Sequence, residues 1–107
     1  MSYKKLVRDK IPEIIKSKGE VPIIRILSEV EYKEELEKKL YEEYQEVIDS
    51  NCSNRIEELA DMLEVISYLA KLEGESLDTV IKKAREKKSE RGGFDKKIYL
   101  EGVEQSK

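Results

Sequence analysis

Two pairs of acidic residues stand three positions apart in segments that otherwise have the apolar spacing of packed helices. Glu43 and Glu46 form the first pair, and Glu58 and Asp61 form the second. Side chains three positions apart lie on the same side of a helix, and these acids fall among apolar positions. An unpaired carboxylate on a packing face is strongly disfavoured. The spacing therefore predicts a site that gathers positive charge.

The residue types available to this site narrow its chemistry. Antiparallel helices joined by a short turn place the end of one helix beside the start of the next, so the two acidic pairs can converge. The chain has no His and a single Cys, which excludes a thiolate zinc site and Ser-His-Asp catalysis. Ligand oxygens alone favour Mg²⁺, with Mn²⁺ as a substitute. The ordinary alternative is that neighbouring Lys or Arg side chains pair with the acids, or that water solvates them.

Length and composition limit the class of protein. The 107 residues, with 24 acidic and 21 basic side chains and a net charge of −3, predict one domain over residues 1–107. No run approaches the roughly 20 apolar residues of a membrane span, and residues 1–10 lack the apolar part of a signal peptide. Nucleic-acid binding normally needs a clear basic excess. We therefore expect a cytoplasmic protein that binds neither membrane nor nucleic acid.

Apolar spacing and capping residues predict an all-α fold whose core is an antiparallel helical hairpin. Ser28 and Glu31 form a capping-box pattern at the start of a long helix. The β-branched segment 21–27 and the short segment 97–100 are expected to pair as a small two-stranded appendage. About four helices are expected, and their ends are predicted before Gly19, near Asp49, before Gly74 and before Gly92.

The third predicted helix is apolar on two faces, which is typical of a helix at the centre of a bundle. One small chain cannot cover that much apolar surface. We therefore expect a homodimer that completes a four-helix bundle, or a dimer of such dimers.

The acidic residues also occur in a recognisable order. Residues 42–47 (EEYQEV) followed by residues 58–63 (ELADML) resemble the EExxE…ExxD signature of the all-α nucleoside triphosphate pyrophosphohydrolases. That superfamily includes MazG-like enzymes, dimeric dUTPases and phosphoribosyl-ATP pyrophosphohydrolase. Residues 5–15 (KLVRDKIPEII) look like the start of a MazG-like or phosphoribosyl-ATP pyrophosphohydrolase-like member.

This resemblance implies a Mg²⁺-dependent hydrolase that splits a nucleoside triphosphate between its α and β phosphates. Glu42 and Glu46 are the candidates for the catalytic base, and Glu42 could instead assist through a second ion. The residues implied as metal ligands are Glu43, Glu46, Glu58 and Asp61.

Basic residues near glycine are candidates for binding the substrate phosphates. Lys87 and Arg91 come just before Gly92 and Gly93, and similar Lys/Arg-Gly-Gly-Phe tails occur in the enzymes named above. Lys5 and Arg8 form a second candidate group near the N-terminus. The structural alternative is a solvated basic helix end for the first group, and helix capping or subunit contact for the second.

Three functions are consistent with these sequence features. The first is a house-cleaning pyrophosphohydrolase of the MazG-like kind. The second is phosphoribosyl-ATP hydrolysis in histidine biosynthesis, although residues 62–65 (MLEV) stand where that enzyme is expected to carry a Tyr-His pair. The third is a non-catalytic helical binding or antitoxin-like module, whose acids only solvate it.

Overall fold

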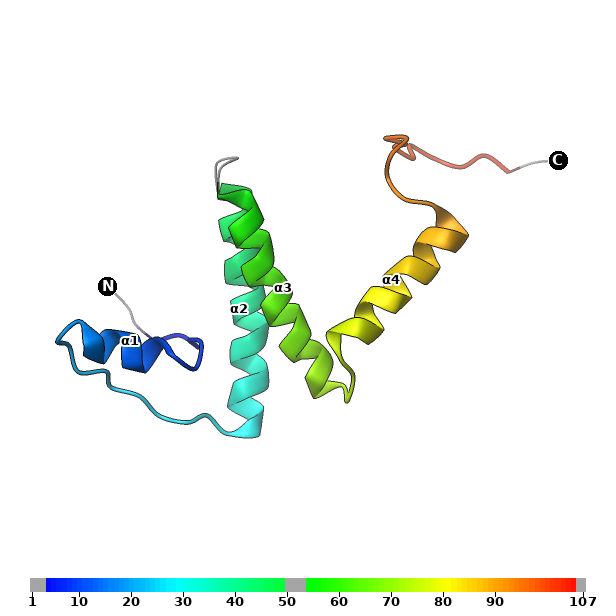
Figure 1. Cartoon of the computed structure of the whole chain (residues 1–107). Coiled ribbons are helices and arrows are strands. Elements are labelled where there is room, and N and C mark those ends of the chain that lie inside the picture. Colours follow the sequence, from blue (N-terminus) through cyan, green and yellow to red (C-terminus); the bar gives the residue numbers. More distant parts are fainter. Residues whose placement is uncertain (1–3, 50–53, 106–107) are drawn as a thin grey trace. The chain divides into compact units, whose positions relative to one another are not determined.

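The computed structural model describes residues 4–49 and 54–105, and these form four helices (Figure 1). The chain divides into two compact units, Met1–Leu77 and Asp78–Lys107, each of which is described by itself. No strand occurs in the described residues, so the all-α prediction is confirmed. The helices are α1 (Ile11–Ser17), α2 (Glu29–Asp49), α3 (Arg55–Leu72) and α4 (Leu77–Arg91).

The first unit is built on an antiparallel hairpin of α2 and α3, as Figure 1 shows. Its packed centre is small: the described residues with less than a tenth of their surface exposed are Leu36, Val65 and Ala70. Leu40 and Val47 lie four and eleven positions after Leu36 on α2 and are partly buried. The hairpin thus holds two long helices together with few fully buried side chains.

The start of α2 is fixed by the predicted capping box. The Glu31 backbone N–H donates to the Ser28 hydroxyl at 3.3 Å, and the Ser28 backbone N–H donates to the Glu31 carboxylate at 3.1 Å. Arg25 adds two hydrogen bonds to the same carboxylate, at 2.8 and 3.1 Å. These contacts satisfy backbone donors that a helix start otherwise leaves unpaired.

The helix ends also agree with the sequence. Gly74 follows α3 with φ +76°, and Gly92 follows α4 with φ +85°. These left-handed conformations cost a glycine little and end a helix. The predicted boundaries near Asp49, Gly74 and Gly92 are therefore confirmed.

The predicted two-stranded appendage is wrong. Residues 21–27 and 97–100 are not strands, and residues 21–27 make none of the backbone hydrogen bonds found among the described parts of the chain. Val21, Ile23 and Ile26 are 87%, 99% and 89% exposed, so most of the segment's β-branched side chains are in contact with solvent. In the other segment the Lys97 N–H donates to the Phe94 carbonyl at 3.1 Å, and Lys97 has φ +59°. That turn bends the backbone out of the extended conformation that a strand requires.

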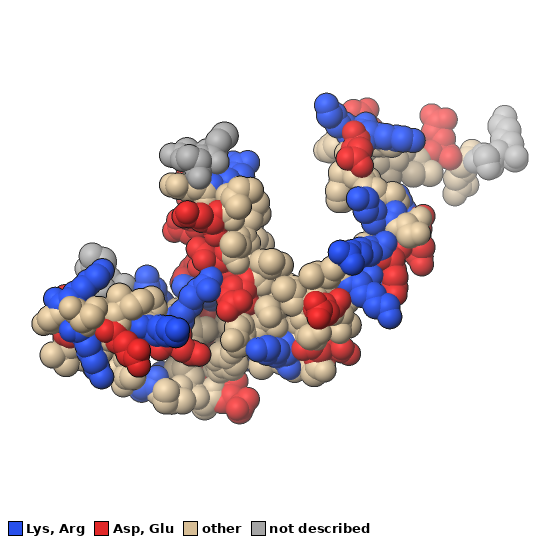
Figure 2. All heavy atoms as spheres, viewed as in Figure 1, with Lys and Arg blue, Asp and Glu red and all other residues tan. Residues whose placement is uncertain are grey.

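The second unit contains nearly all of α4 and the residues after it. The fifteen residues of α4 include six basic and three acidic side chains, and none of the fifteen is buried. Figure 2 shows Lys and Arg side chains gathered over this helix, whereas Asp and Glu are prominent over α2 and α3. No helix in the described parts of the chain is long and apolar enough to cross a membrane.

Candidate metal centre

Three carboxylates of the hairpin converge. One oxygen each of Glu43, Glu58 and Asp61 lies within 4.8 Å of the other two, and all three residues are partly buried. Glu43 comes from the last two turns of α2, and the other two come from the first two turns of α3. Antiparallel packing joins these parts of the helices, as the sequence predicted. We call these three residues the acidic cluster.

The electrostatics of the acidic cluster centre on Glu58. Its pKa is raised, first because partial burial penalises the charged form, and then because Glu46, Asp61 and Glu43 carry like charge nearby. No ion pair joins Glu58 to a Lys or Arg in the part of the chain that the structure describes. A cation placed here would relieve the repulsion that acts on Glu58.

Two basic side chains already reach the outer carboxylates. The Arg8 guanidinium donates to the Asp61 carboxylate at 2.8 Å and lies 3.9 Å from that of Glu64. On α2, the Lys39 ammonium lies 3.6 Å from the Glu43 carboxylate. These pairs partly compensate the charges of Asp61 and Glu43, whereas Glu58 has no such ion pair among the described residues.

The donor set fits a small divalent ion. Mg²⁺ binds oxygens at 2.0–2.1 Å in an octahedron, which puts neighbouring ligand oxygens about 3 Å apart and opposite ones about 4 Å apart. The oxygens of the acidic cluster, within 4.8 Å of one another, approach this spacing, and small side-chain rotations would complete it. Three carboxylates leave further coordination positions for water or phosphate oxygens.

The other predicted carboxylates lie at the edge of the site. Glu46 is not among the three convergent residues and is exposed, although its charge contributes to the raised pKa of Glu58. Glu42 is exposed and lies 3.8 Å from the ammonium of Lys39. The structure thus brings together three of the four predicted metal ligands.

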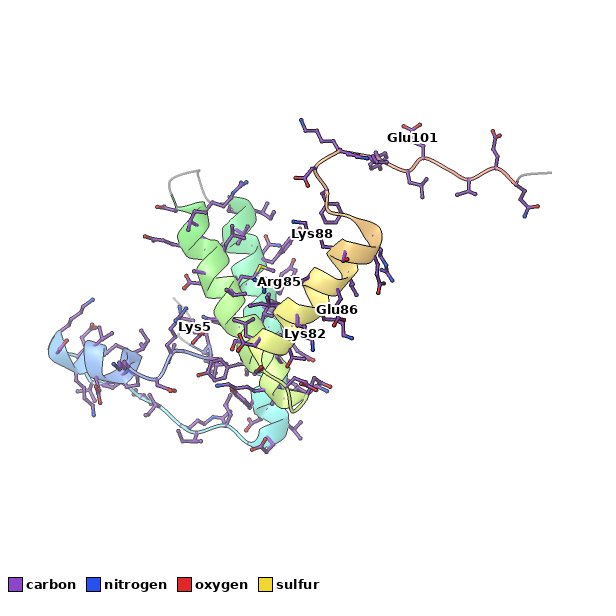
Figure 3. The ribbon with its side chains drawn as sticks, turned by 45° about the vertical axis from the view of Figure 1, so that its right-hand side comes forward. Lys5, Lys82, Arg85, Glu86, Lys88 and Glu101 are labelled. Carbon is purple, nitrogen blue, oxygen red and sulfur yellow. The ribbon has the colours of Figure 1, made fainter. Side chains whose placement is uncertain are left out.

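The predicted phosphate-binding residues have different surroundings. Arg8 lies at the acidic cluster, and Lys5 is exposed in the same N-terminal segment (Figure 3). Lys87 and Arg91 are exposed on α4 in the second unit. Figure 3 shows that α4 also carries Lys82, Arg85 and Lys88, so basic side chains continue along the helix.

Two further residues were missed by the sequence reasoning. Lys39 stands four positions before Glu43, a helical spacing from which the contact could have been predicted. Glu64 was not singled out in the sequence, yet it shares Arg8 with Asp61. That contact joins positions more than fifty residues apart, and no local pattern indicates it.

Comparisons with known proteins add little to this geometry. No family model matches the chain, and no solved structure matches it. An uncharacterized protein from Mycolicibacterium smegmatis is 52% identical over 42 residues, which is 39% of this chain. The match spans 43% of that protein's length. The chain is therefore similar to this relative over less than half of either sequence.

Proposed function

We propose that this protein is a Mg²⁺-dependent nucleoside triphosphate pyrophosphohydrolase. It would hydrolyse the bond between the α and β phosphates and release a nucleoside monophosphate and pyrophosphate. The main support is the convergence of Glu43, Glu58 and Asp61 on a packed helical hairpin. The resemblance of residues 42–47 and 58–63 to the EExxE…ExxD signature supports the same reaction.

In this proposal the acidic cluster holds the ion, which supplies positive charge for the polyphosphate and acidifies water. Glu46 lies beside the cluster and is exposed to solvent, so it is our first choice for the base, with Glu42 as the alternative. The base takes a proton from the attacking water. The water oxygen bonds to the α phosphorus, and the bond to the bridging oxygen breaks as pyrophosphate leaves.

The cationic residues would hold the polyphosphate. Arg8 is the strongest candidate because its guanidinium already lies at Asp61, and a guanidinium can donate two parallel hydrogen bonds to a phosphate. Lys5, Lys87 and Arg91 are proposed as further phosphate contacts on the basis of their charge and exposure. We also propose that the protein acts on free nucleotides in the cytoplasm and that it forms a homodimer or a dimer of dimers.

The proposal is tested by measuring pyrophosphate release from a panel of nucleoside triphosphates and phosphoribosyl-ATP, with and without Mg²⁺. Release that requires Mg²⁺ is expected, and the preferred substrate separates the house-cleaning reaction from the histidine-pathway reaction. Thermal melting with Mg²⁺ alone is the companion measurement, because an ion that binds the folded chain raises its melting temperature.

A specific observation favours a second candidate, the non-catalytic helical module. Arg8 and Lys39 already pair with acids of the cluster, as they would if these charges served only the fold. This function is expected to give no pyrophosphate from any substrate and no stabilisation by Mg²⁺.

A further inference from the structure

Lys39 differs from the other cations that pair with acids in this chain. Its side chain is 21% exposed, whereas the other cations in the described ion pairs have side chains that are 57% to 69% exposed. Lys39 stands three positions after Leu36, which is 4% exposed, so helical spacing puts both residues on one side of α2. Most of the aliphatic part of Lys39 is therefore covered, and packing restricts where its ammonium can lie.

The Lys39 ammonium lies at the edge of the acidic cluster without a hydrogen bond to it. It is 3.6 Å from the Glu43 carboxylate and 3.8 Å from the Glu42 carboxylate, and both distances are longer than a hydrogen bond. Attraction between opposite charges therefore holds the ammonium in place. Its three N–H donors are not committed to these two carboxylates, so they can donate to another acceptor that comes within reach.

The charges of the metal centre show why such a donor is needed. The three carboxylates of the acidic cluster carry three negative charges when they are ionised, and one Mg²⁺ supplies two positive charges. The cluster and its ion would together keep a negative charge and repel a polyphosphate, which is itself negative. The two cations that pair with the cluster, Arg8 and Lys39, reverse this sign. They are what makes the ion-loaded cluster attractive to an anion.

We propose that Lys39 is a phosphate-binding residue of the metal centre, on the α2 side of the acidic cluster, with Arg8 on the α3 side. This inference rests on the proposed function, because it needs an ion at the acidic cluster. In this structure the Lys39 ammonium pairs with Glu43; when Glu43 holds an ion instead, the ammonium donates to a phosphate oxygen. Since packing already restricts the Lys39 side chain, it loses little conformational freedom on binding.

The ligand that this arrangement favours is a polyphosphate bound together with its ion, rather than the ion alone. A bare ion has to compete with Lys39 for Glu43 and with Arg8 for Asp61. A polyphosphate that arrives with the ion offers both displaced cations new oxygen acceptors, and hydrogen bonds between charged groups are the strong ones. Exposed Glu46 adds negative charge nearby, which increases the need for both cations.

The alternative role for Lys39 is to hold Glu43 in position for the ion. A cation that only positions a ligand strengthens metal binding, so its loss weakens it. A cation that competes with the ion for the same carboxylate weakens metal binding, so its loss strengthens it. The 3.6 Å separation favours competition, because attraction without a hydrogen bond does not fix the orientation of a carboxylate.

The proposal is tested on the full chain with Lys39→Met, which keeps an unbranched, largely apolar side chain and removes the charge. Calorimetry measures the binding of Mg²⁺ alone and, at saturating Mg²⁺, the binding of inorganic tripolyphosphate. The dissociation constant of Mg²⁺ is expected to fall at least about threefold, and that of tripolyphosphate to rise at least about tenfold. KM for the nucleotide is expected to rise with the second constant.

Two further variants frame this result. Lys39→Arg keeps the charge and is expected to hold both constants within about threefold of the wild type. Lys38→Met is the matched control, since Lys38 is 69% exposed and its ammonium lies 3.1 Å from the Glu35 carboxylate; it is expected to change neither constant more than about twofold. Helical circular dichroism checks the fold of each variant, and Lys39→Gln takes the place of Lys39→Met if the added methionine causes association.

Weaker Mg²⁺ binding or unchanged tripolyphosphate binding in Lys39→Met would overturn the assignment, and so would equal losses in Lys38→Met. A wild type that binds tripolyphosphate through Lys39 but releases no pyrophosphate from any nucleotide would refute the proposed reaction and support this assignment. A wild type that hydrolyses nucleotides, while Lys39→Met keeps its KM and its affinity for tripolyphosphate, would do the reverse. A wild type that binds neither Mg²⁺ nor tripolyphosphate would overturn both.

Discussion

The acidic cluster and a set of exposed apolar side chains lie on the same half of the same two helices, yet they present different surfaces to solvent. Around Glu58 the hairpin has surplus negative charge, and the pKa of this residue is raised. Around Leu63 it has apolar side chains in contact with water. The first surface is dominated by like charges and the second by apolar side chains, so different changes are expected to perturb them.

This difference shows that charge and apolar surface are distributed differently on one small hairpin. Electrostatic repulsion is strongest where burial lowers the effective dielectric, so it acts on partly buried Glu58, to which exposed Glu46 also contributes. Apolar exposure is additive over area, and on this half of the hairpin it is spread over six side chains, Tyr41, Tyr44, Ile48, Ile56, Leu59 and Leu63. A change at one surface should therefore leave the other working, unless it removes the packing between α2 and α3.

Leu36→Ala should have the largest effect on stability, because it removes packing between α2 and α3, which both surfaces need. Leu36 is 4% exposed and is the most buried side chain among the described residues, so its truncation is expected to cost about 2–4 kcal/mol of unfolding free energy. Urea denaturation is the measurement. Ile23→Ala, at a 99% exposed position, should stay within about 0.5 kcal/mol of the wild type. Equal losses in the two variants would show that the hairpin core is not where the stability lies.

Glu58→Gln should break the acidic cluster alone. It keeps the shape of the side chain but removes the central ligand charge, so Mg²⁺-dependent turnover is expected to fall at least about a hundredfold and stabilisation by Mg²⁺ to disappear. Without metal its melting temperature should rise, because partial burial and neighbouring like charges, which raise the pKa of Glu58, disfavour the charged carboxylate in the folded chain. Steady-state kinetics and calorimetric melting are the measurements. Glu34→Gln, on an exposed turn of α2, is the control, and most of the activity surviving in Glu58→Gln would refute the metal assignment.

Arg8→Gln tests whether the Arg8 side chain binds phosphate or only pairs with Asp61. The Arg8–Asp61 pair is largely exposed, so its loss is expected to cost less than about 1 kcal/mol of stability. If Arg8 binds phosphate, KM for the triphosphate should rise about tenfold, while the Mg²⁺ concentration for half-maximal activity falls because a competing cation has left Asp61. Titrations of substrate and metal separate these effects, with Lys10→Gln as the control. An unchanged KM would leave Arg8 with a structural role.

The smallest expected effect lies away from both surfaces, at the start of α2. Arg25 and Ser28 lower the pKa of Glu31 from 4.5 to about 2 in the folded chain. Because the folded pKa is below the unfolded one, the carboxylate stabilises the fold above pH 4.5 and loses this contribution as the pH falls towards 2. Urea denaturation at pH 2–6 should show that the free energy of unfolding falls as the pH is lowered. Glu31→Gln is expected to reduce this dependence on pH and Glu29→Gln to retain it. The same pH dependence of the unfolding free energy in both variants would contradict the assignment.

Local features of this chain could be predicted from its sequence, and long-range ones could not. The capping box of Ser28 and Glu31 was predicted because both partners lie within one helical turn. Helical spacing and antiparallel packing also predicted the convergence of Glu43 with Glu58 and Asp61, since a short turn joins their helices. Their role as metal ligands stays a prediction.

The predictions that were wrong or missing depend on contacts between residues far apart in the sequence. A strand is stable only when another strand pairs with it. The β-branched composition of residues 21–27 favours an extended backbone but does not indicate whether a pairing strand exists. The contact between Arg8 and Asp61 depends on the path of the N-terminal segment, which no helical periodicity describes. Glu46 shares the spacing of the other acids, but its rotation on α2 carries it towards solvent.

The hydrogen bonds that join Arg25, Ser28 and Glu31 have a kinetic consequence. All three residues lie within seven consecutive positions, and a loop of this size closes in about 10–100 ns. The adjoining α2–α3 turn is short as well, so the contacts of the hairpin have low sequence separation and its folding should be fast.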